Sequence, residues 1–191
     1  MTPLTPSSPS AEWINQIDWL RDEARSLGFG DIRISDTDMS QVGPKLREWL
    51  EAGRHGDMNY MSQHEHLRVQ PALLHEGTIR VLTVRMDYLP DTSEVRSAID
   101  WRQAELQKEQ QASDGTIAIY ARGRDYHKVL RSRLQDLATR IQEKIGSFGY
   151  RVFVDSGPVM EVELAQKSGL GWRGKHTLLL NREAGSMFFL G

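Results

Sequence analysis

The stretch YRVFVDSGPVMEVELAQK, residues 150–167, decides the class of fold. Its first five residues are aromatic or β-branched around a single arginine, which predicts a strand over 150–154. Pro158 then predicts the first turn of a helix that runs over 158–167 and ends near Gly169. A strand that leads directly into a helix is typical of α/β domains.

Asp155 lies between this strand and this helix. In open α/β sheets, ligands bind outside the carboxyl ends of the strands. A carboxyl group that a ligand partly desolvates there can have its pKa raised enough to act as a general acid near neutral pH. The same position also suits a helix cap, in which Asp155 or Ser156 accepts backbone N–H bonds. Both interpretations of Asp155 are open at this point.

Further helices and strands are predicted on both sides of this stretch. Apolar residues with helical spacing predict helices over 13–27, 45–52 and 126–145, with short helices joined by loops over 54–77. Alternating or β-branched runs predict strands over 31–35, 78–88, 116–120, 177–181 and 186–190. The Pro- and Ser-rich residues 1–10 predict a disordered tail, and the polar residues 91–114 a solvated helix or mobile insertion. We therefore expect one α/β domain over 11–191.

Composition narrows the class of protein. The 191 residues contain no cysteine, which excludes disulfides, thiolate nucleophiles and cysteine-ligated metal clusters from this chain. The first ten residues do not resemble a secretory signal, and no run is long and apolar enough to span a membrane, so a cytoplasmic protein is expected. The apolar ending SMFFLG at 186–191 predicts that the natural sequence continues past Gly191.

Two other segments are candidates for binding. The three glycines of SGLGWRGKH, residues 168–176, let the backbone approach an anion or cofactor, although an ordinary glycine-rich turn is the commoner explanation of such a pattern. Seven basic residues against three acidic ones fall over 122–144, and this face could contact RNA phosphates or be an ordinary solvated helix. The histidines at 55, 64, 66 and 75 fit no common zinc spacing, so no metal ligands are expected.

The order of four motifs resembles one enzyme family. These are HGDMNYM at 55–61, RVLTVRMDYLP at 80–90, ARGRDYHKVLRSRL at 121–134 and the whole of 154–191, beginning VDSGPVMEVELAQKSGLGW. Together they are similar to the N-terminal region of epoxyqueuosine reductases. The resemblance implies a nitroreductase-like, cobalamin-binding fold with a central mixed β-sheet flanked by helices. It also implies that a ferredoxin-like module with two 4Fe-4S clusters follows this region, which fits the absence of cysteine.

The resemblance implies roles for particular residues. Asp155 matches the acid that protonates the substrate oxygen while cobalamin reduces the epoxide of epoxyqueuosine at the wobble position of tRNA. The positions implied to line the cobalamin pocket are Arg68, Ala118, Asp155, Val162, Arg173, His176 and Leu179. The basic candidates for holding the tRNA are Arg122, Arg124, Lys128 and Arg131. An external electron donor, a monomeric state and no membrane partner complete the expectation.

Two alternatives use the same scaffold. A cobalamin carrier without enzymatic activity would keep the pocket and would have no need of Asp155. A flavin-dependent reductase would bind a different cofactor. As an epoxyqueuosine reductase, the 191-residue chain alone is expected to be inactive, because it lacks ligands for the electron-delivering clusters.

Overall fold

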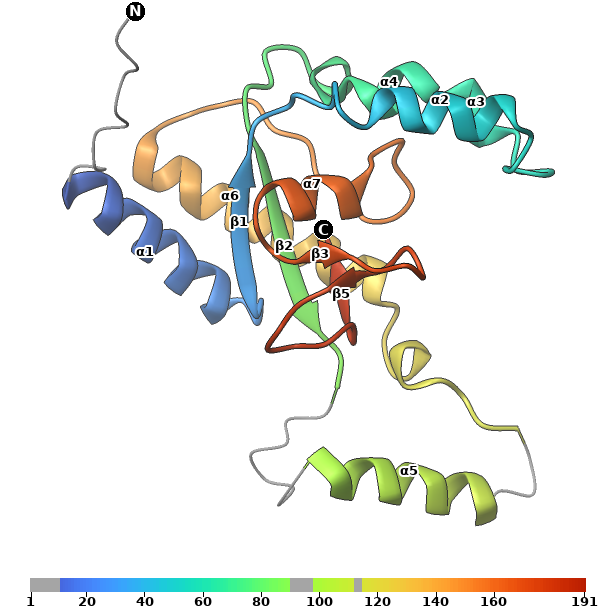
Figure 1. Ribbon diagram of the computed structural model, residues 1–191. Helices are drawn as coiled ribbons and strands as arrows, with labels where there is room; N and C mark the ends of the chain where they lie inside the picture. Colours follow the sequence, from blue (N-terminus) through green and yellow to red (C-terminus); the bar gives the residue numbers. More distant parts are fainter. Residues whose placement is uncertain (1–10, 90–97, 112–114) are drawn as a thin grey trace, which may run out of the picture.

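The structure, a computed structural model, describes residues 11–89, 98–111 and 115–191 (Figure 1). The predicted tail at 1–10 and parts of the predicted insertion at 91–97 and 112–114 lie outside these ranges. The helices are α1 (Ala11–Ser26), α2 (Gly43–Glu51), α3 (Tyr60–Gln63), α4 (Glu65–Val69), α5 (Ala98–Gln111), α6 (Tyr126–Ile145) and α7 (Glu161–Lys167), with 3-10 turns η1 (Pro71–Leu74) and η2 (Ile119–Ala121). The strands are β1 (Asp31–Ser35), β2 (Val81–Asp87), β3 (Trp172–Arg173), β4 (Leu179–Leu180) and β5 (Phe188–Leu190).

The central sheet has the order β1-β2-β5. Ile32 pairs with Val84, and Arg85 pairs with Leu190, in antiparallel register. The last strand therefore pairs with β2 across about a hundred residues of sequence. A second, two-stranded antiparallel sheet joins β3 and β4.

Helices cover both faces of the central sheet. In Figure 1, α6 passes behind β1 and β2, whereas α7 lies in front of them. The main core fills the space between α1, α6 and the sheet, and its buried residues are Leu20, Ala24, Phe29, Ile32, Val84, Met86, Leu130, Leu137 and Val154. A smaller core joins α7 to β4 and β5 through Ala165, Leu170 and Leu179. Helix α5 covers neither face, because it lies away from the sheet (Figure 1).

The predicted α/β architecture of a sheet flanked by helices is confirmed, with four local differences. The pairings between the described strands are antiparallel, whereas a mixed sheet was expected. Residues 150–154 form no strand, and none of the described strands pairs with them. Residues 116–120 end in the turn η2 instead of a strand, and the helix predicted from Pro158 begins at Glu161.

None of the helices within the described ranges is long and apolar enough to cross a lipid bilayer.

Candidate active site

Asp155 follows Val154, which is fully buried in the main core. Its backbone has a left-handed conformation with φ of 54°, which aspartate tolerates better than most residues. The backbone N–H of Asp155 donates to Glu161 Oε1 at 3.0 Å. The N-cap of α7 is Met160, and its first turn has no side-chain cap bond. The helix-cap interpretation of Asp155 is therefore wrong, and its side chain is left for other partners.

Two aromatic side chains at the start of α6 contact the Asp155 carboxylate. The Tyr126 hydroxyl donates a hydrogen bond to Asp155 Oδ2, and His127 Nε2 lies 3.3 Å from the same oxygen. Asp155 Oδ1 has no hydrogen bond from the residues that the structure describes. Because the Asp155 side chain is 45% exposed, this second oxygen is available to a ligand.

His127 is held from its other side by Asp125, which is the N-cap of α6. Asp125 Oδ1 accepts the backbone N–H of His127 at 3.0 Å and lies 2.9 Å from His127 Nδ1. The contact with His127 holds the pKa of Asp125 below its ordinary value. A charged Asp125 therefore favours the imidazole tautomer that carries its proton on Nδ1.

A stack of rings fixes Tyr126 in place. The Tyr126 ring lies parallel to Phe189 of β5, with centroids 3.9 Å apart, and stacks on His127 at 4.0 Å. Burial, followed by the hydrogen bond to Asp155, raises the pKa of the Tyr126 phenol far above its ordinary value. Tyr126 therefore stays protonated and acts as a hydrogen-bond donor.

Glu161 joins this cluster through its hydrogen bond from the backbone N–H of Asp155. Burial, followed by the charge of Asp155, raises the pKa of Glu161 to about 7. The site thus holds three carboxyl groups from two segments far apart in the sequence: Asp125 before α6, and Asp155 and Glu161 beside α7. We call Asp125, Tyr126, His127, Asp155 and Glu161 the acid cluster.

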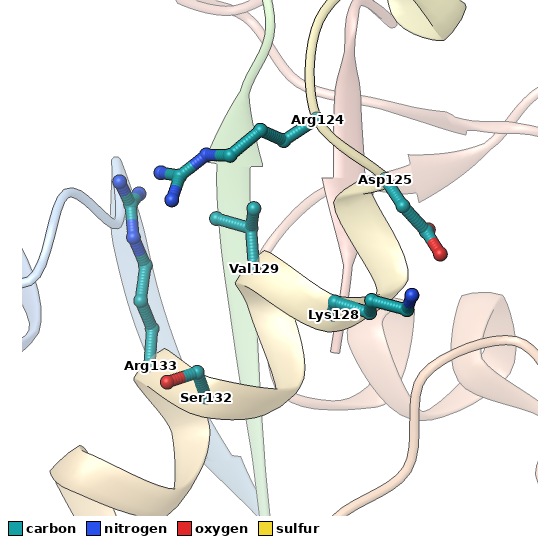
Figure 2. Close-up of a pocket in the computed structure, with 6 residues that line it drawn as sticks. All are labelled: Arg124, Asp125, Lys128, Val129, Ser132 and Arg133. Atoms are coloured by element: carbon teal, nitrogen blue, oxygen red, sulfur yellow. The ribbon is translucent and has the colours of Figure 1, made fainter.

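A basic hollow adjoins the acid cluster. It has a volume of about 500 Å³ and is lined by Arg124, Asp125, Lys128, Val129, Ser132 and Arg133 (Figure 2). Figure 2 shows the guanidinium groups of Arg124 and Arg133 converging above Val129, whereas Lys128 and Asp125 point to the other side. Asp125 belongs to both features, so an anion in the hollow would lie next to the acid cluster.

The chain is similar to known proteins over most of its length. Residues 68–156 match the family model described as "Epoxyqueuosine reductase QueG, DUF1730". Epoxyqueuosine reductase of Burkholderia pseudomallei is 56% identical over 175 residues, which cover 87% of this chain and 42% of the relative. The protein of the same name from Alicycliphilus denitrificans is 54% identical over 168 residues, covering 88% of this chain and 46% of the relative. The chain belongs to the epoxyqueuosine reductase family. It spans less than half the length of these curated relatives.

Solved epoxyqueuosine reductases share the fold. The structure from Streptococcus thermophilus has a TM-score of 0.69 at 24% identity, over 92% of this chain and 44% of that one. A complex of an epoxyqueuosine reductase with an epoxyqueuosine-modified tRNA stem loop has a TM-score of 0.69 at 21% identity, over 93% of this chain and 44% of that one. A third structure, from Bacillus subtilis, has its aspartate-bearing catalytic loop swung out of the active site. Its TM-score is 0.65 at 18% identity, over 93% of this chain and 44% of that one.

The residues implied for the cobalamin pocket of an epoxyqueuosine reductase fall into two groups. Val162 lies on α7, and Arg173 and Leu179 lie on β3 and β4, with His176 in the turn between them. Arg68 on α4 and Ala118 before η2 lie on separate elements.

Most side chains of the first group are engaged within the chain. Arg173 donates to Glu163 Oε1 at 2.6 Å, and the Leu179 side chain is only 3% exposed within the smaller core. His176 Nδ1 accepts the backbone N–H of Leu178 at 3.3 Å. What this group can offer a ligand is therefore mainly backbone. By contrast, Arg68 Nε is buried and has no hydrogen-bond partner within the described residues.

The basic residues predicted to bind tRNA have different surroundings. Arg122 pairs with Glu105 of α5 at 2.7 Å and donates to the carbonyl of Ile117 at 2.8 Å, as expected of an ordinary surface cation. Arg124 and Lys128 line the basic hollow and form no ion pair with the described residues. Arg131 is exposed on α6 outside the lining of the hollow. Arg133, which was not predicted, completes the hollow.

Sequence reasoning missed the partners of Asp155. The sequence placed Tyr126 and His127 only at the start of the predicted helix over 126–145. They lie 29 and 28 positions before Asp155, and no spacing rule links such distant residues. The one usable signal is that RGRDYH, residues 122–127, and the Asp155 motif both belong to the four motifs that carry the family resemblance.

Proposed function

We propose that this chain forms the proton-donating part of an epoxyqueuosine reductase, which reduces the epoxide of epoxyqueuosine in tRNA to give queuosine. The observation that carries the proposal is the acid cluster, in which Tyr126 and His127 both contact Asp155 Oδ2 and no described residue hydrogen-bonds to Oδ1. Family membership supplies the reaction. The solved relative with a catalytic loop that carries an aspartate supports a role for Asp155 on its left-handed loop.

The proposed chemistry needs a positioned acid. Opening an epoxide leaves an alkoxide-like oxygen, and a proton delivered to it in the transition state contributes typically about 100-fold to 10,000-fold. Tyr126 and His127 both contact Oδ2 of Asp155, so the proton would leave from Oδ1. Because the phenol of Tyr126 stays protonated, it orients the carboxyl group without competing as the acid.

We propose that cobalamin is the cofactor and that residues 11–191 form its binding domain. When bound, cobalamin would supply the electrons for the reduction. The backbone around Val162, Arg173, His176 and Leu179 would hold it together with Arg68 and Ala118. The buried Arg68 Nε, which has no hydrogen-bond partner among the described residues, supports this assignment. The two 4Fe-4S clusters need cysteine ligands, which this chain lacks.

The proposed cofactor has a direct test. Adding hydroxocobalamin to the purified complete gene product should change the visible spectrum of the cobalamin, and Arg68→Met should weaken the binding. An unchanged spectrum would remove the assignment. A yellow protein with a flavin spectrum as isolated would instead favour the flavin-dependent reductase.

The proposed macromolecular partner is tRNA that carries epoxyqueuosine. The protein would act on it in the cytoplasm. The basic hollow supports this partner because Arg124, Lys128 and Arg133 outnumber Asp125, the one acid of the lining, which is occupied by His127. Phosphate groups are the natural ligands of converging guanidinium groups. A relative solved with an epoxyqueuosine-modified stem loop supports the same partner.

The reaction itself is tested with the complete gene product, cobalamin, a low-potential reductant and tRNA that carries epoxyqueuosine. The proposal expects conversion to queuosine, detected by mass spectrometry of the digested tRNA. Cobalamin binding without conversion under reducing conditions would favour the carrier alternative instead.

A further inference from the structure

The proposed reduction consumes more protons than Asp155 holds. Removing an epoxide oxygen breaks both C–O bonds, forms a carbon–carbon double bond and releases the oxygen as water. This balance requires two electrons from the external low-potential donor and two protons. Asp155 carries one proton, so it must be reloaded within each turnover.

His127 is placed to reload it. Its Nε2 lies 3.3 Å from Asp155 Oδ2, and its Nδ1 lies 2.9 Å from Asp125 Oδ1. With Nδ1–H directed at Asp125, the Nε2 atom is the one that takes up and gives a proton. The His127 side chain is 46% exposed, so it reaches solvent from the side of α6.

We propose that His127, oriented by Asp125, is the residue that transfers protons from solvent to Asp155. The first proton leaves Asp155 Oδ1 as the first C–O bond breaks. The imidazolium then gives its Nε2 proton to Oδ2 of the Asp155 carboxylate and becomes neutral, and rotation of the carboxyl group about Cβ–Cγ turns this protonated oxygen toward the substrate. The reloaded Asp155 protonates the oxygen a second time as it leaves as water, and solvent reprotonates His127. This inference rests on the proposed function.

The other groups facing Asp155 do not suit this task. Tyr126 holds its proton too tightly, because burial and the bond to Asp155 raise its pKa. Glu161 accepts the backbone N–H of Asp155 and does not hydrogen-bond to its carboxylate. Besides these, the charged groups next to His127 are Asp125, which contacts its Nδ1, and Lys128, the next residue of α6.

The test compares variants of the complete gene product with reduced methyl viologen as the electron source. His127→Gln keeps an amide donor toward Asp155 but cannot titrate, so the steady-state rate should fall by about 100-fold and the loss of rate as pH rises should disappear. In His127→Ala, added imidazole should restore a large part of the rate. Neither the pH profile nor imidazole rescue is expected of a residue that only supports the structure. His64→Gln, the same substitution at an exposed histidine on another element, is the matched control and should keep the parent rate.

The outcomes separate the two proposals. A His127→Gln rate within about twofold of the parent, with an unchanged pH profile, would overturn the role of His127, because solvent would then reload Asp155 directly. If Asp155→Asn were inactive in the same experiment, the proposed function would stand without the transfer. Full activity of both variants would overturn both proposals.

Discussion

Asp155 illustrates how one side chain can be divided between structure and chemistry. Its backbone N–H is bound by Glu161, and its Oδ2 atom is bound by Tyr126 and His127. Its other oxygen is left for a ligand. These contacts position the carboxyl group beside the open side of the site, which is what a proton donor requires.

At the same scale, Glu161 should make stability depend on pH. Burial raises its pKa from the ordinary 4.5 to about 7, so between these values the folded chain keeps a proton that the unfolded chain has released. The free energy of unfolding therefore falls as pH rises through this window. Glu161→Gln keeps an oxygen for the Asp155 N–H but cannot ionise. Urea denaturation from pH 5 to 8 should show a smaller loss of stability in the variant, and an equal loss would contradict the buried carboxyl.

At the scale of elements, α6 connects the core to the site. Its first turn carries Tyr126 and His127, and its next turns bury Leu130 and Leu137 against the sheet. The packing of these leucines therefore sets the position of both the acid cluster and the basic hollow. A change in the packing of α6 would move both.

Leu130 gives this element a stability test. It is fully buried in the main core, so Leu130→Ala should lower the free energy of unfolding by about 2–5 kcal/mol. Leu106 on α5 is 55% exposed, and Leu106→Ala should change the free energy of unfolding by less than about 0.5 kcal/mol. Denaturant titrations measure both changes. Equal effects of the two variants would contradict the packing of α6.

Across the whole molecule, the basic hollow and the acid cluster lie on adjoining sides of the α6 start. Asp125 lines the hollow and also holds His127. A nucleic acid whose phosphate occupies the hollow could therefore place a nucleoside near Asp155. This arrangement gives one surface both the binding and the chemistry that the proposed function requires.

The hollow makes a prediction about salt dependence. The Arg124→Glu and Lys128→Glu double variant should bind tRNA more weakly and reduce the slope of log affinity against log salt by about 2, because two phosphate contacts are lost. Lys45→Glu, at an exposed lysine of α2 outside the hollow, is the control and should leave the slope nearly unchanged. Gel-shift titrations at several salt concentrations measure the slopes. Equal slopes for the parent and the double variant would contradict the phosphate assignment.

Local pattern predicted much of this fold but little of the detailed site. Periodic apolar residues located α1 and α6, and the run at 78–88 located β2, because such signals lie within one element. Residues 150–154 have strand-like composition but pair with none of the described strands, because pairing depends on the whole fold. Asp155 was found from its motif. Its partners Tyr126 and His127 were not, because only folding brings the start of α6 to the loop before α7.

The most direct test of the central claim is the rate of conversion of epoxyqueuosine tRNA by the Asp155→Asn variant of the complete gene product. Asp136→Asn, at an exposed aspartate of α6 outside the acid cluster, is the matched control. We predict that Asp155→Asn is slower by at least about 100-fold while it still binds cobalamin and tRNA, and that the control is unchanged. A parent-like rate for Asp155→Asn would contradict the role of Asp155 as the proton donor.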